Sequence, residues 1–344
     1  MASTYGPDTE KEEAPDMPES DRVASGTDGR PASERAPPVP LAELNAHPRD
    51  SRITFMEEGH VYEVDGGRDG WISTTTFIHG LFPQFDADQI IRKMMAGRNW
   101  AKSKYHGMSA EEIKQQWAEN GSSAAADGTA MHADIERLYN GLPPLTPDCK
   151  EMRMFNDFRQ EFSDLVPWRT EMTIFDETVG ICGSVDMVYC DPEEPGAFLI
   201  YDWKRSKAIK RSNYWENGSH PYTCKLPNCN FIHYSLQLGI YKRILQTRYG
   251  MKVNGTFLVV LHPLQHTFQR IETQNSDVVV EALFRQRQAA RSIVSRSKHG
   301  RDDAEANAAE ANADEANADE ASEEQGDKRR KSSHGAEPDV DSAV

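Results

Sequence analysis

Long apolar segments and closely spaced cysteines are missing from this chain of 344 residues. No run of about 18 consecutive apolar residues occurs, and the first 30 residues are acidic and rich in Pro, Ser and Gly. We therefore expect no membrane span, no secretory signal and no transit peptide. The five cysteines are too few and too irregularly spaced for a disulfide framework, which indicates a reducing, intracellular compartment.

Hydrophobic residues are also scarce, at 38% of the chain against about 45–50% in a typical folded protein. The deficit lies in two terminal arms. Residues 1–50 carry 11 acidic and 5 basic side chains, and residues 298–344 carry 14 and 6. We predict that both arms are disordered, because neither has periodic apolar residues to bury. Residues 51–297 therefore have a net charge of only −2, out of −16 for the whole chain. They are long enough for one domain.

The C-terminal arm contains a near-repeat, EANADEANADEA, followed by a basic cluster from Lys328 to Lys331. The repeat has no apolar face that a helix could bury, so its expected role is solvation. The basic cluster is typical of a nuclear-import patch, although such clusters are common in tails. We expect the nucleus if the cluster acts as such a patch and the cytoplasm otherwise. The arms could contact replication or recombination proteins.

The period of the apolar residues changes along residues 51–297. A hairpin is predicted at 53–67, and Ser73 or Thr74 is expected to cap a short helix after it. The class predicted is α/β or α+β, with a mixed central sheet flanked by helices and a helical N-terminal half. The pattern predicts helices at 87–105, 109–120, 123–140, 148–165, 231–249 and 277–297, and strands at 168–176, 180–190, 197–204, 255–262 and 266–272.

Two aspartates are expected at neighbouring strand ends. Asp186 lies on the strand that ends near Cys190, and the next strand delivers Asp202 and Lys204 at its end. Such carboxylates repel each other unless they share a proton or hold a cation, and hard oxygen ligands suit Mg²⁺ or Mn²⁺. A lysine beside that cation can orient or deprotonate a water for phosphodiester hydrolysis. The alternative is a surface ion pair, but the apolar run FLIY before Asp202 favours a buried strand.

Two predicted helices each carry a polar pair at i and i+4 spacing: His132 with Glu136, and Gln237 with Tyr241. Alone, each pair is better explained by a solvated helix face. In chain order, however, GTxxHxxxE, G-x-[apolar]-D, an apolar strand ending in D-x-K, and QxxxY form a set. This set resembles the RecB-like branch of the PD-(D/E)XK nuclease superfamily. It is similar to stand-alone exonucleases such as the mitochondrial genome maintenance exonuclease and its phage and viral relatives, and it covers residues 128–241.

The resemblance implies a restriction-endonuclease-like core and a bound Mg²⁺ or Mn²⁺. It implies that Lys204 supports the attacking water and that Glu136 orients the metal ligands. Gln237 and Tyr241 would brace Lys204 or hold the substrate backbone, and Glu171 matches a position where relatives often carry an acid. The metal ligands implied are His132, Asp186, Asp202 and the backbone carbonyl of Trp203.

Two other metal centres are not expected. Relatives with an iron–sulfur cluster place three closely spaced cysteines after the QxxxY motif, but this chain has no cysteine after Cys229. Four residues of types that ligate zinc lie close together in the sequence: His220, Cys224, Cys229 and His233. The spacing of the two cysteines is loose for a zinc site, and His233 falls at the start of a predicted helix. The alternative is a polar insertion near the mouth of the site.

Two basic segments are candidates for contacts with DNA. Four bases follow the D-x-K motif closely, and a solvated loop would also explain them. Residues 92–105 interleave bases with aromatics, as single-strand channels do, although Trp100 could equally be a core residue. The candidate residues are Arg205, Lys207, Lys210 and Arg211 in the first segment, and Arg98, Trp100 and Lys102 in the second.

The sequence therefore favours a metal-dependent deoxyribonuclease, with DNA as its partner, that acts on single-stranded or frayed ends in replication, recombination or repair. A structure-selective endonuclease is one alternative. A catalytically silent nucleic-acid-binding protein is another, but the intact set of Asp186, Asp202, Lys204 and His132 disfavours it. No G-x-x-x-x-G-K-[ST] sequence is present, so a helicase motor would have to lie in another chain.

Overall fold

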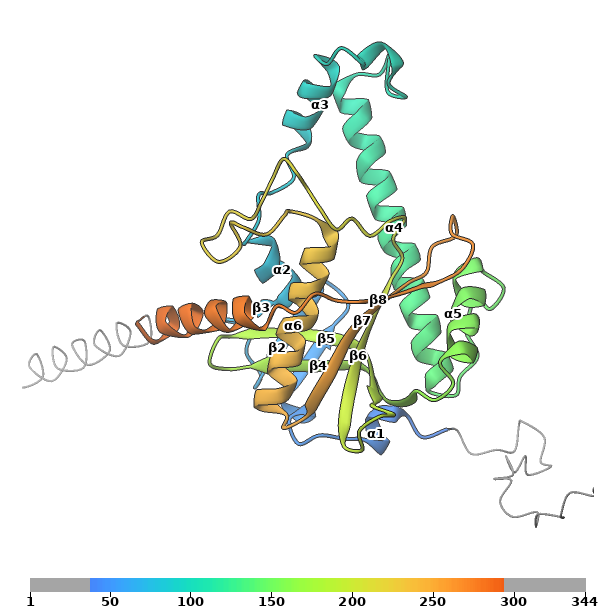
Figure 1. The fold of residues 1–344 in the computed structure, drawn as a ribbon, viewed down its shortest axis with the longest axis vertical. Helices are drawn as coiled ribbons and strands as arrows, with labels where there is room; N and C mark the ends of the chain where they lie inside the picture. The colour runs from blue at the N-terminus through green and yellow to red at the C-terminus, as the bar shows by residue number, and fades with distance from the viewer. Residues whose placement is uncertain (1–37, 294–344) are drawn as a thin grey trace, which may run out of the picture. The chain divides into compact units, whose positions relative to one another are not determined.

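The computed structural model describes residues 38–293, which include a six-stranded mixed sheet (Figure 1). The strand order is β3-β5-β6-β7-β8. β3 and β6 pair with opposite ends of β5, and β4 pairs with β5 along its whole length. β6 and β7 run parallel, as do β3 and β5, and the other pairs are antiparallel. The predicted mixed sheet is therefore confirmed. The strands are β3 (Ile72–Ser73), β4 (Val166–Asp176), β5 (Ile181–Cys190), β6 (Ala197–Lys204), β7 (Lys252–Val260) and β8 (Gln269–Glu272).

Helices cover both faces of this sheet. On one face, α4 (Ala110–Tyr139) and α5 (Lys150–Glu161) pack aromatic and methionine side chains against Tyr201 and Trp203 of β6. On the other face, α2 (Thr74–His79), α6 (Asn230–Arg248) and the helix over residues 277–293 enclose a second core. The alternation of β6 therefore sends Trp203 toward α5 and its neighbours Asp202 and Lys204 toward α6. No helix of residues 38–293 has the length and apolar character needed to span a membrane.

The predicted hairpin is confirmed. β1 (Ile53–Met56) pairs with β2 (Val61–Val64) in antiparallel register, and Gly59 takes a positive φ of 81° in the turn between them. The predicted cap of α2 is Ser73, whose side chain accepts a hydrogen bond from the Thr76 amide. The hairpin packs on β4 and β5 through Ile53, Tyr62 and Val64.

The folded unit begins before residue 51, so the predicted arm over residues 1–50 is too long. Residues 39–50 hold a short helix, α1 (Leu41–Leu44), and η2 (Asp50–Arg52) follows at their end. Arg49 lies over the Phe175 ring at 4.0 Å and pairs with Glu177 at 2.9 Å. These contacts join segments more than a hundred residues apart, so no local pattern could reveal them. Residues 1–37 and 294–344, which contain the rest of both predicted arms, lie outside the described residues.

Four of the predicted helices were wrong in their limits, including the helix predicted at 148–165, which ends at Glu161. The helix predicted at 87–105 ends early: α3 (Ala87–Met95) stops before Gly97, and only the short η3 (Trp100–Lys102) follows. The two helices predicted at 109–120 and 123–140 are one continuous helix, α4. Helix α4 therefore continues through Gly121 and Gly128, although each glycine costs about 1 kcal/mol in a helix. A capping box at Ser109 and Glu112 starts α4, and Met131 and Ile135 anchor its end in the core.

Candidate metal centre

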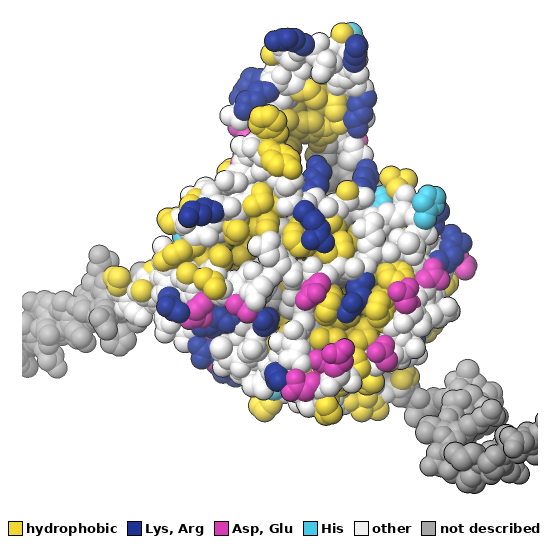
Figure 2. All heavy atoms as spheres, viewed as in Figure 1, with side chains coloured by type: hydrophobic (Ala, Val, Ile, Leu, Met, Phe, Trp, Pro, Cys, Tyr) yellow, Lys and Arg dark blue, Asp and Glu magenta, His cyan; other side chains and the backbone are white. Residues whose placement is uncertain are grey.

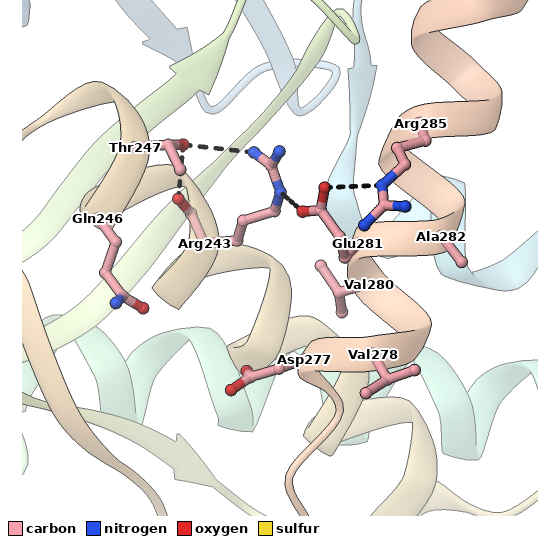
Figure 3. A pocket seen from close by; sticks show the side chains of 9 residues that line it. All are labelled: Arg243, Gln246, Thr247, Asp277, Val278, Val280, Glu281, Ala282 and Arg285. Carbon is pink, nitrogen blue, oxygen red and sulfur yellow. Dashed lines mark hydrogen bonds and ion pairs between the residues drawn. The ribbon is translucent and has the colours of Figure 1, made fainter.

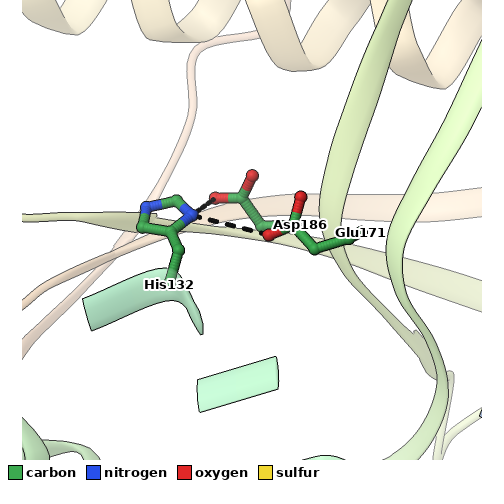
Figure 4. Close-up of side chains that lie close together, drawn as sticks. All are labelled: His132, Glu171 and Asp186. Carbon is green, nitrogen blue, oxygen red and sulfur yellow. Dashed lines mark ion pairs between the residues drawn. The ribbon is translucent and has the colours of Figure 1, made fainter. Parts of the chain in front are cut away.

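Three side chains from three elements converge at one side of the sheet (Figure 4). His132 Nδ1 of α4 lies 3.6 Å from Glu171 Oε1 of β4 and 3.5 Å from Asp186 Oδ2 of β5. One ligand atom of each residue lies within 4.8 Å of the others, and among the described residues these form the group of His, Cys, Asp and Glu able to share a cation. All three side chains are half-buried. This His/Glu/Asp group could therefore bind a metal ion.

The strand register explains why acidic residues meet here. Thr170 and Met172 of β4 pair with Met187 and Val185 of β5, so Glu171 stands opposite Asp186. Continuing the antiparallel register of β5 and β6 places Asp202 on the other side of Asp186. The paired segment of β5 and β6 ends just before Asp186 and Asp202, so backbone hydrogen bonds do not close the space between them. Three carboxylates on three neighbouring strands thus form a row.

Glu171 has an unusual backbone conformation. Its φ is +43° in the middle of an eleven-residue strand, although a residue with a side chain rarely enters this region. Such strain costs about 1–3 kcal/mol and persists only where surrounding structure imposes it, often at functional sites. Ser184 on β5 donates a hydrogen bond of 3.0 Å to Glu171 Oε2, which fixes the carboxylate beside Asp186.

Asp202 and Lys204 form the second half of the centre. Lys204 Nζ lies 2.6 Å from Asp202 Oδ2 and 4.7 Å from the ring centroid of Tyr234 on α6. Asp202 is 1% exposed, and its Oδ1 has no hydrogen-bond partner among the described residues. A buried carboxylate oxygen without a donor is costly, so this atom is suited to a ligand that the chain itself does not supply.

The charges of the centre are unbalanced. Burial raises the pKa of Asp202 to about 6, although Lys204 opposes this shift. Burial also raises the pKa of Asp186, with a further contribution from the charge of Glu171. Burial disfavours the charged form of His132, but Asp186 and Glu171 outweigh burial and raise its pKa to about 9. Negative charge therefore exceeds what Lys204 can offset.

This donor set fits a divalent cation. Carboxylate oxygens are the ligands that Mg²⁺ prefers, and Mn²⁺ also accepts an imidazole nitrogen. A cation here would relieve the repulsion that raises the carboxylate pKa values and would displace the proton from His132.

The ligand set implied by the resemblance contains Asp202 and the Trp203 carbonyl, which are not in this group, and lacks Glu171, which is. Asp202 lies outside the His132, Glu171 and Asp186 group and contacts Lys204 instead. The Trp203 carbonyl lies 2.9 Å from His132 Nε2, and the Trp203 amide donates a hydrogen bond of 2.9 Å to Asp186 Oδ2. Trp203 therefore fixes the orientation of both His132 and Asp186 through its backbone.

Gln237 and Tyr241 lie behind the centre. Gln237 Nε2 donates a hydrogen bond of 3.1 Å to the Tyr241 hydroxyl, and both side chains are buried in α6. A Cβ atom added to Gly183 would lie 2.6 Å from the Tyr241 ring, so only glycine fits at this position of β5. The side chain over Lys204 is Tyr234, which the sequence did not single out. Its signal was its i and i+3 relation to Gln237 on the same helix.

Glu136 lies one helical turn beyond His132 and is half-buried. Burial, together with the nearby charges of Glu171 and Glu57, raises its pKa. No hydrogen bond fixes its carboxylate within residues 38–293.

The expected phosphate contacts divide into two kinds. Arg205 is mostly buried and pairs with Glu151 at 2.8 Å and with Asp127 at 3.0 Å, which ties α4 and α5 to the end of β6. Lys207, Lys210 and Arg211 are exposed. Arg205 therefore has a structural role in the described fold, whereas the three later bases face solvent.

The second basic segment lies at the end of the molecule formed by α3, η3 and the start of α4. Figure 2 shows Lys and Arg side chains around this end. Arg98 and Lys102 are exposed, and Trp100 is half-buried with its ring 5.8 Å from that of His106. Trp100 belongs to none of the three core clusters of the described residues, so the alternative that it is a core residue is not supported.

The four residues considered for zinc do not form a shared site among residues 38–293. Cys229 is buried at the start of α6, whereas Cys224 is exposed and contacts the Pro221 carbonyl. The His233 ring packs on Phe82 at 4.2 Å, and the Tyr222 amide donates a hydrogen bond to His220.

A cavity of about 560 Å³ lies away from the metal centre, between α6 and the helix over residues 277–293 (Figure 3). Arg243 Nε contacts Glu281 at 2.9 Å, and Arg285 contacts the same carboxylate at 3.1 Å. Asp277, which also lines the cavity, pairs with Lys242 at 3.0 Å, so the carboxylates that line the cavity are already paired with basic side chains.

Comparison with known proteins gives weak likenesses. No family model and no curated protein matches this sequence. The crystal structure of SSO0001 aligns with 65% of this chain and 77% of its own, at 13% identity and a TM-score of 0.26. A protein named "Putative exonuclease" from Eubacterium rectale aligns with 67% of this chain and 82% of its own, at 16% identity and a TM-score of 0.33. At these scores neither likeness bears on the residues of the centre.

Proposed function

We propose that this chain is a divalent-metal-dependent deoxyribonuclease with a PD-(D/E)XK core, and that it is an exonuclease on single-stranded or frayed ends. The observation that carries the proposal is the row of Glu171, Asp186 and Asp202 beside His132 and Lys204. Carboxylates gathered around an unbalanced negative centre suit a cation, and a lysine at its edge suits a phosphate substrate.

The residues divide the work as follows. His132, Glu171, Asp186 and Asp202 would hold Mg²⁺ or Mn²⁺. A bound divalent cation supplies Lewis acidity toward a phosphoryl oxygen. Lys204 remains protonated because Asp202 and Asp186 raise its pKa despite its burial. Its ammonium therefore holds the attacking water and offsets charge on the phosphate, and it does not act as a base.

The reaction forms one bond and breaks one. The water oxygen bonds to phosphorus and releases its proton to solvent, the P–O bond to the leaving nucleotide breaks, and the leaving oxygen takes a proton from solvent. Trp203 keeps His132 and Asp186 in place through its backbone, and Tyr234 covers Lys204 and limits the access of bulk water to it.

The test is cleavage of end-labelled single-stranded DNA by the full chain in Mg²⁺ and in Mn²⁺, with EDTA as the control. We expect cleavage with either cation and none with EDTA. A closed circular single strand distinguishes the two modes of cleavage, since an exonuclease leaves it intact and a structure-selective endonuclease does not. Binding without cleavage under all metal conditions would favour a silent nucleic-acid-binding protein and would overturn the proposal.

A further inference from the structure

Two large aromatic side chains stand almost entirely in solvent. Tyr214 is 88% exposed and Trp215 is 95% exposed, the highest values among the large hydrophobic residues described. Both lie in the segment that leaves β6 after Lys204 and returns to α6, residues 205–229. Neither ring stacks on another aromatic side chain of residues 38–293. Two exposed rings of this size on consecutive residues are typical of a surface that binds a ligand or partner.

The backbone that carries these rings is fixed. Asn213 Oδ1 accepts a hydrogen bond of 3.1 Å from the Trp215 amide, and Asn213 Nδ2 donates one of 2.8 Å to the Asn228 carbonyl. The Asn228 amide in turn donates to the Glu216 carbonyl at 2.8 Å. The turn is therefore pinned on both sides of the aromatic pair. A fixed backbone with free rings lowers the entropy cost of binding a planar ligand.

The segment also has the charge that phosphate requires. Residues 205–229 contain five basic side chains and one acidic one, whereas residues 51–297 as a whole have a net charge of −2. Lys207, Lys210 and Arg211 are exposed. Positive charge beside exposed aromatic rings suits a nucleic acid as the partner, because its phosphates are negative and its bases can stack. An apolar surface of another protein would not need the positive charge.

Contacts along one face of α6 connect this turn to the metal centre. Lys204 lies over the ring of Tyr234 at 4.7 Å, and Arg211 lies over the ring of Phe231 at 4.3 Å. Phe231 and Tyr234 are three residues apart and thus neighbours on the helix surface. Trp215 follows Arg211 by four residues, which an extended chain spans in at most about 14 Å.

We propose that Tyr214 and Trp215 form a stacking platform for the unpaired bases of single-stranded DNA, and that Lys210 and Arg211 hold the phosphates between the platform and the metal centre. The proposal rests on the proposed nuclease function for its substrate class. Stacking accepts any base, because every base has a π face, so the platform selects unpaired strands and not a sequence. A blunt duplex keeps its bases stacked internally and cannot use it.

The experiment measures binding of a fluorescein-labelled oligothymidylate and of a blunt duplex of the same length in EDTA, where no cleavage occurs. The full chain is compared with the double variants Tyr214→Leu/Trp215→Leu and Tyr214→Phe/Trp215→Phe. Leucine keeps an apolar side chain and removes the π face, whereas phenylalanine keeps both. We expect the leucine variant to bind the single strand about tenfold or more weakly, since one lost stack costs about 5- to 150-fold. The phenylalanine variant should bind within about threefold of the wild type.

A matched control comes from the same segment. Tyr222 is 45% exposed, but its ring lies 5.5 Å from that of His220 and is already engaged. Tyr222→Leu should therefore leave single-strand binding unchanged. Melting temperatures of all variants should stay close to that of the wild type, because neither platform ring is buried. Duplex binding should be equal in every variant.

The outcomes separate this proposal from the proposed function. Equal single-strand affinity in the leucine variant and the wild type would overturn the platform and leave the two rings for a protein partner. Equal loss in the phenylalanine variant would also overturn it, since the π face would then not be the cause. If the platform result holds but the wild type cleaves nothing in Mg²⁺ or Mn²⁺, the nuclease proposal fails and the platform stands.

Discussion

Two buried aspartates near the ends of β4 and β6, the strands that lie on either side of β5, have opposite surroundings. Asp176 at the end of β4 is 0% exposed, and Asp202 at the end of β6 is 1% exposed. Asp176 accepts hydrogen bonds from the Thr178 amide and hydroxyl at 2.9 and 2.6 Å and lies 2.9 Å from Arg248 Nε, in ion-pair geometry. Asp202 has the Lys204 ammonium and an Oδ1 without a partner among the described residues.

The pKa shifts of the two groups follow from these partners. Burial alone would raise the pKa of Asp176, but Arg248 and Thr178 outweigh burial and lower it. Burial raises the pKa of Asp202 to about 6 because Lys204 does not offset it. A buried carboxylate whose charge is offset by its partners stabilises the fold, and one whose charge is not offset is a candidate site. Substitution of each aspartate tests whether the two differ in this way.

The largest effect is expected from Asp202→Asn. Asparagine keeps the size of the side chain and removes the charge that would hold the cation. DNA cleavage in Mg²⁺ should fall by about a thousandfold or more, which corresponds to the several kcal/mol that a metal contributes. The melting temperature should stay the same or rise, because Asp186 still offsets Lys204 and one source of repulsion is gone. DNA binding should persist or tighten, and full cleavage by this variant would remove Asp202 from the centre.

Removal of residues 39–50 should cost the most stability. Arg169 is 5% exposed and contacts Asp50 Oδ2 at 2.7 Å and the Asn45 carbonyl at 3.0 Å, so a chain starting at residue 51 leaves it buried without these partners. Loss of one member of a buried pair costs about 3–5 kcal/mol, or roughly 10 °C in melting temperature. A chain starting at residue 38 is the control and should melt like the full chain. Equal melting of the two shortened chains would restore residue 51 as the boundary.

Asp176→Asn should act on stability and not on cleavage. The change leaves Arg248 and Arg243 without their shared carboxylate, and because both are partly exposed we expect about 3 kcal/mol, the low end for such a loss. Thermal unfolding measures the loss. Cleavage per folded molecule, measured well below the melting temperature, should match the wild type. A thousandfold loss of cleavage in this variant would erase the distinction from Asp202.

These contrasts show which parts of the molecule the sequence could predict. Strands β4 to β6 were predicted within two residues at each end, because period-two patterns and the DPEEPG turn are local. The sequence also predicted that Asp186 and Asp202 lie side by side, because this requires only that β5 and β6 pair in antiparallel register. The positive φ of Glu171, the position of Tyr234 over Lys204 and the early start of the domain depend on contacts between distant segments. No local pattern encodes them. The exposure of Tyr214 and Trp215 was also hidden, because an aromatic pair in a sequence is as consistent with a core as with a surface.

Acid should destabilise the Asp176 region selectively. Arg49 outweighs burial and lowers the pKa of the adjacent Glu177 to about 2, and the pKa of Asp176 is lowered as well. A lowered folded pKa gives stability that is present above the unfolded value and is lost as the pH falls through the folded value. Stability should therefore decline from about pH 4.5 toward pH 2, by about 1 kcal/mol for Glu177, because this side chain is 37% exposed and partly screened.

Urea unfolding across this pH range measures the decline. Glu177→Gln should start with lower stability at neutral pH and lose less of it on acidification. Asp202→Asn should not reduce the acid loss, since Asp202 has a raised pKa and its protonation favours the folded state. An acid loss that disappears in Asp202→Asn and persists in Glu177→Gln would reverse the assignment of the two regions.

The smallest effect concerns the end of the molecule formed by α3 and η3. If Arg98 and Lys102 each contact one phosphate of a single strand, replacing both with Gln should flatten the dependence of log K on log salt by about 1.4, at about 0.7 for each contact. Both side chains are exposed, so the melting temperature should not change. The matched variant is Lys210→Gln/Arg211→Gln near the start of α6, which should flatten the slope by the same amount if the strand follows that path. Titration of an oligothymidylate at several salt concentrations gives both slopes. The salt dependence reports phosphate contacts directly, whereas base stacking does not change it. A flatter slope in the Lys210→Gln/Arg211→Gln variant alone would therefore indicate that the strand runs along α6 and not along α3.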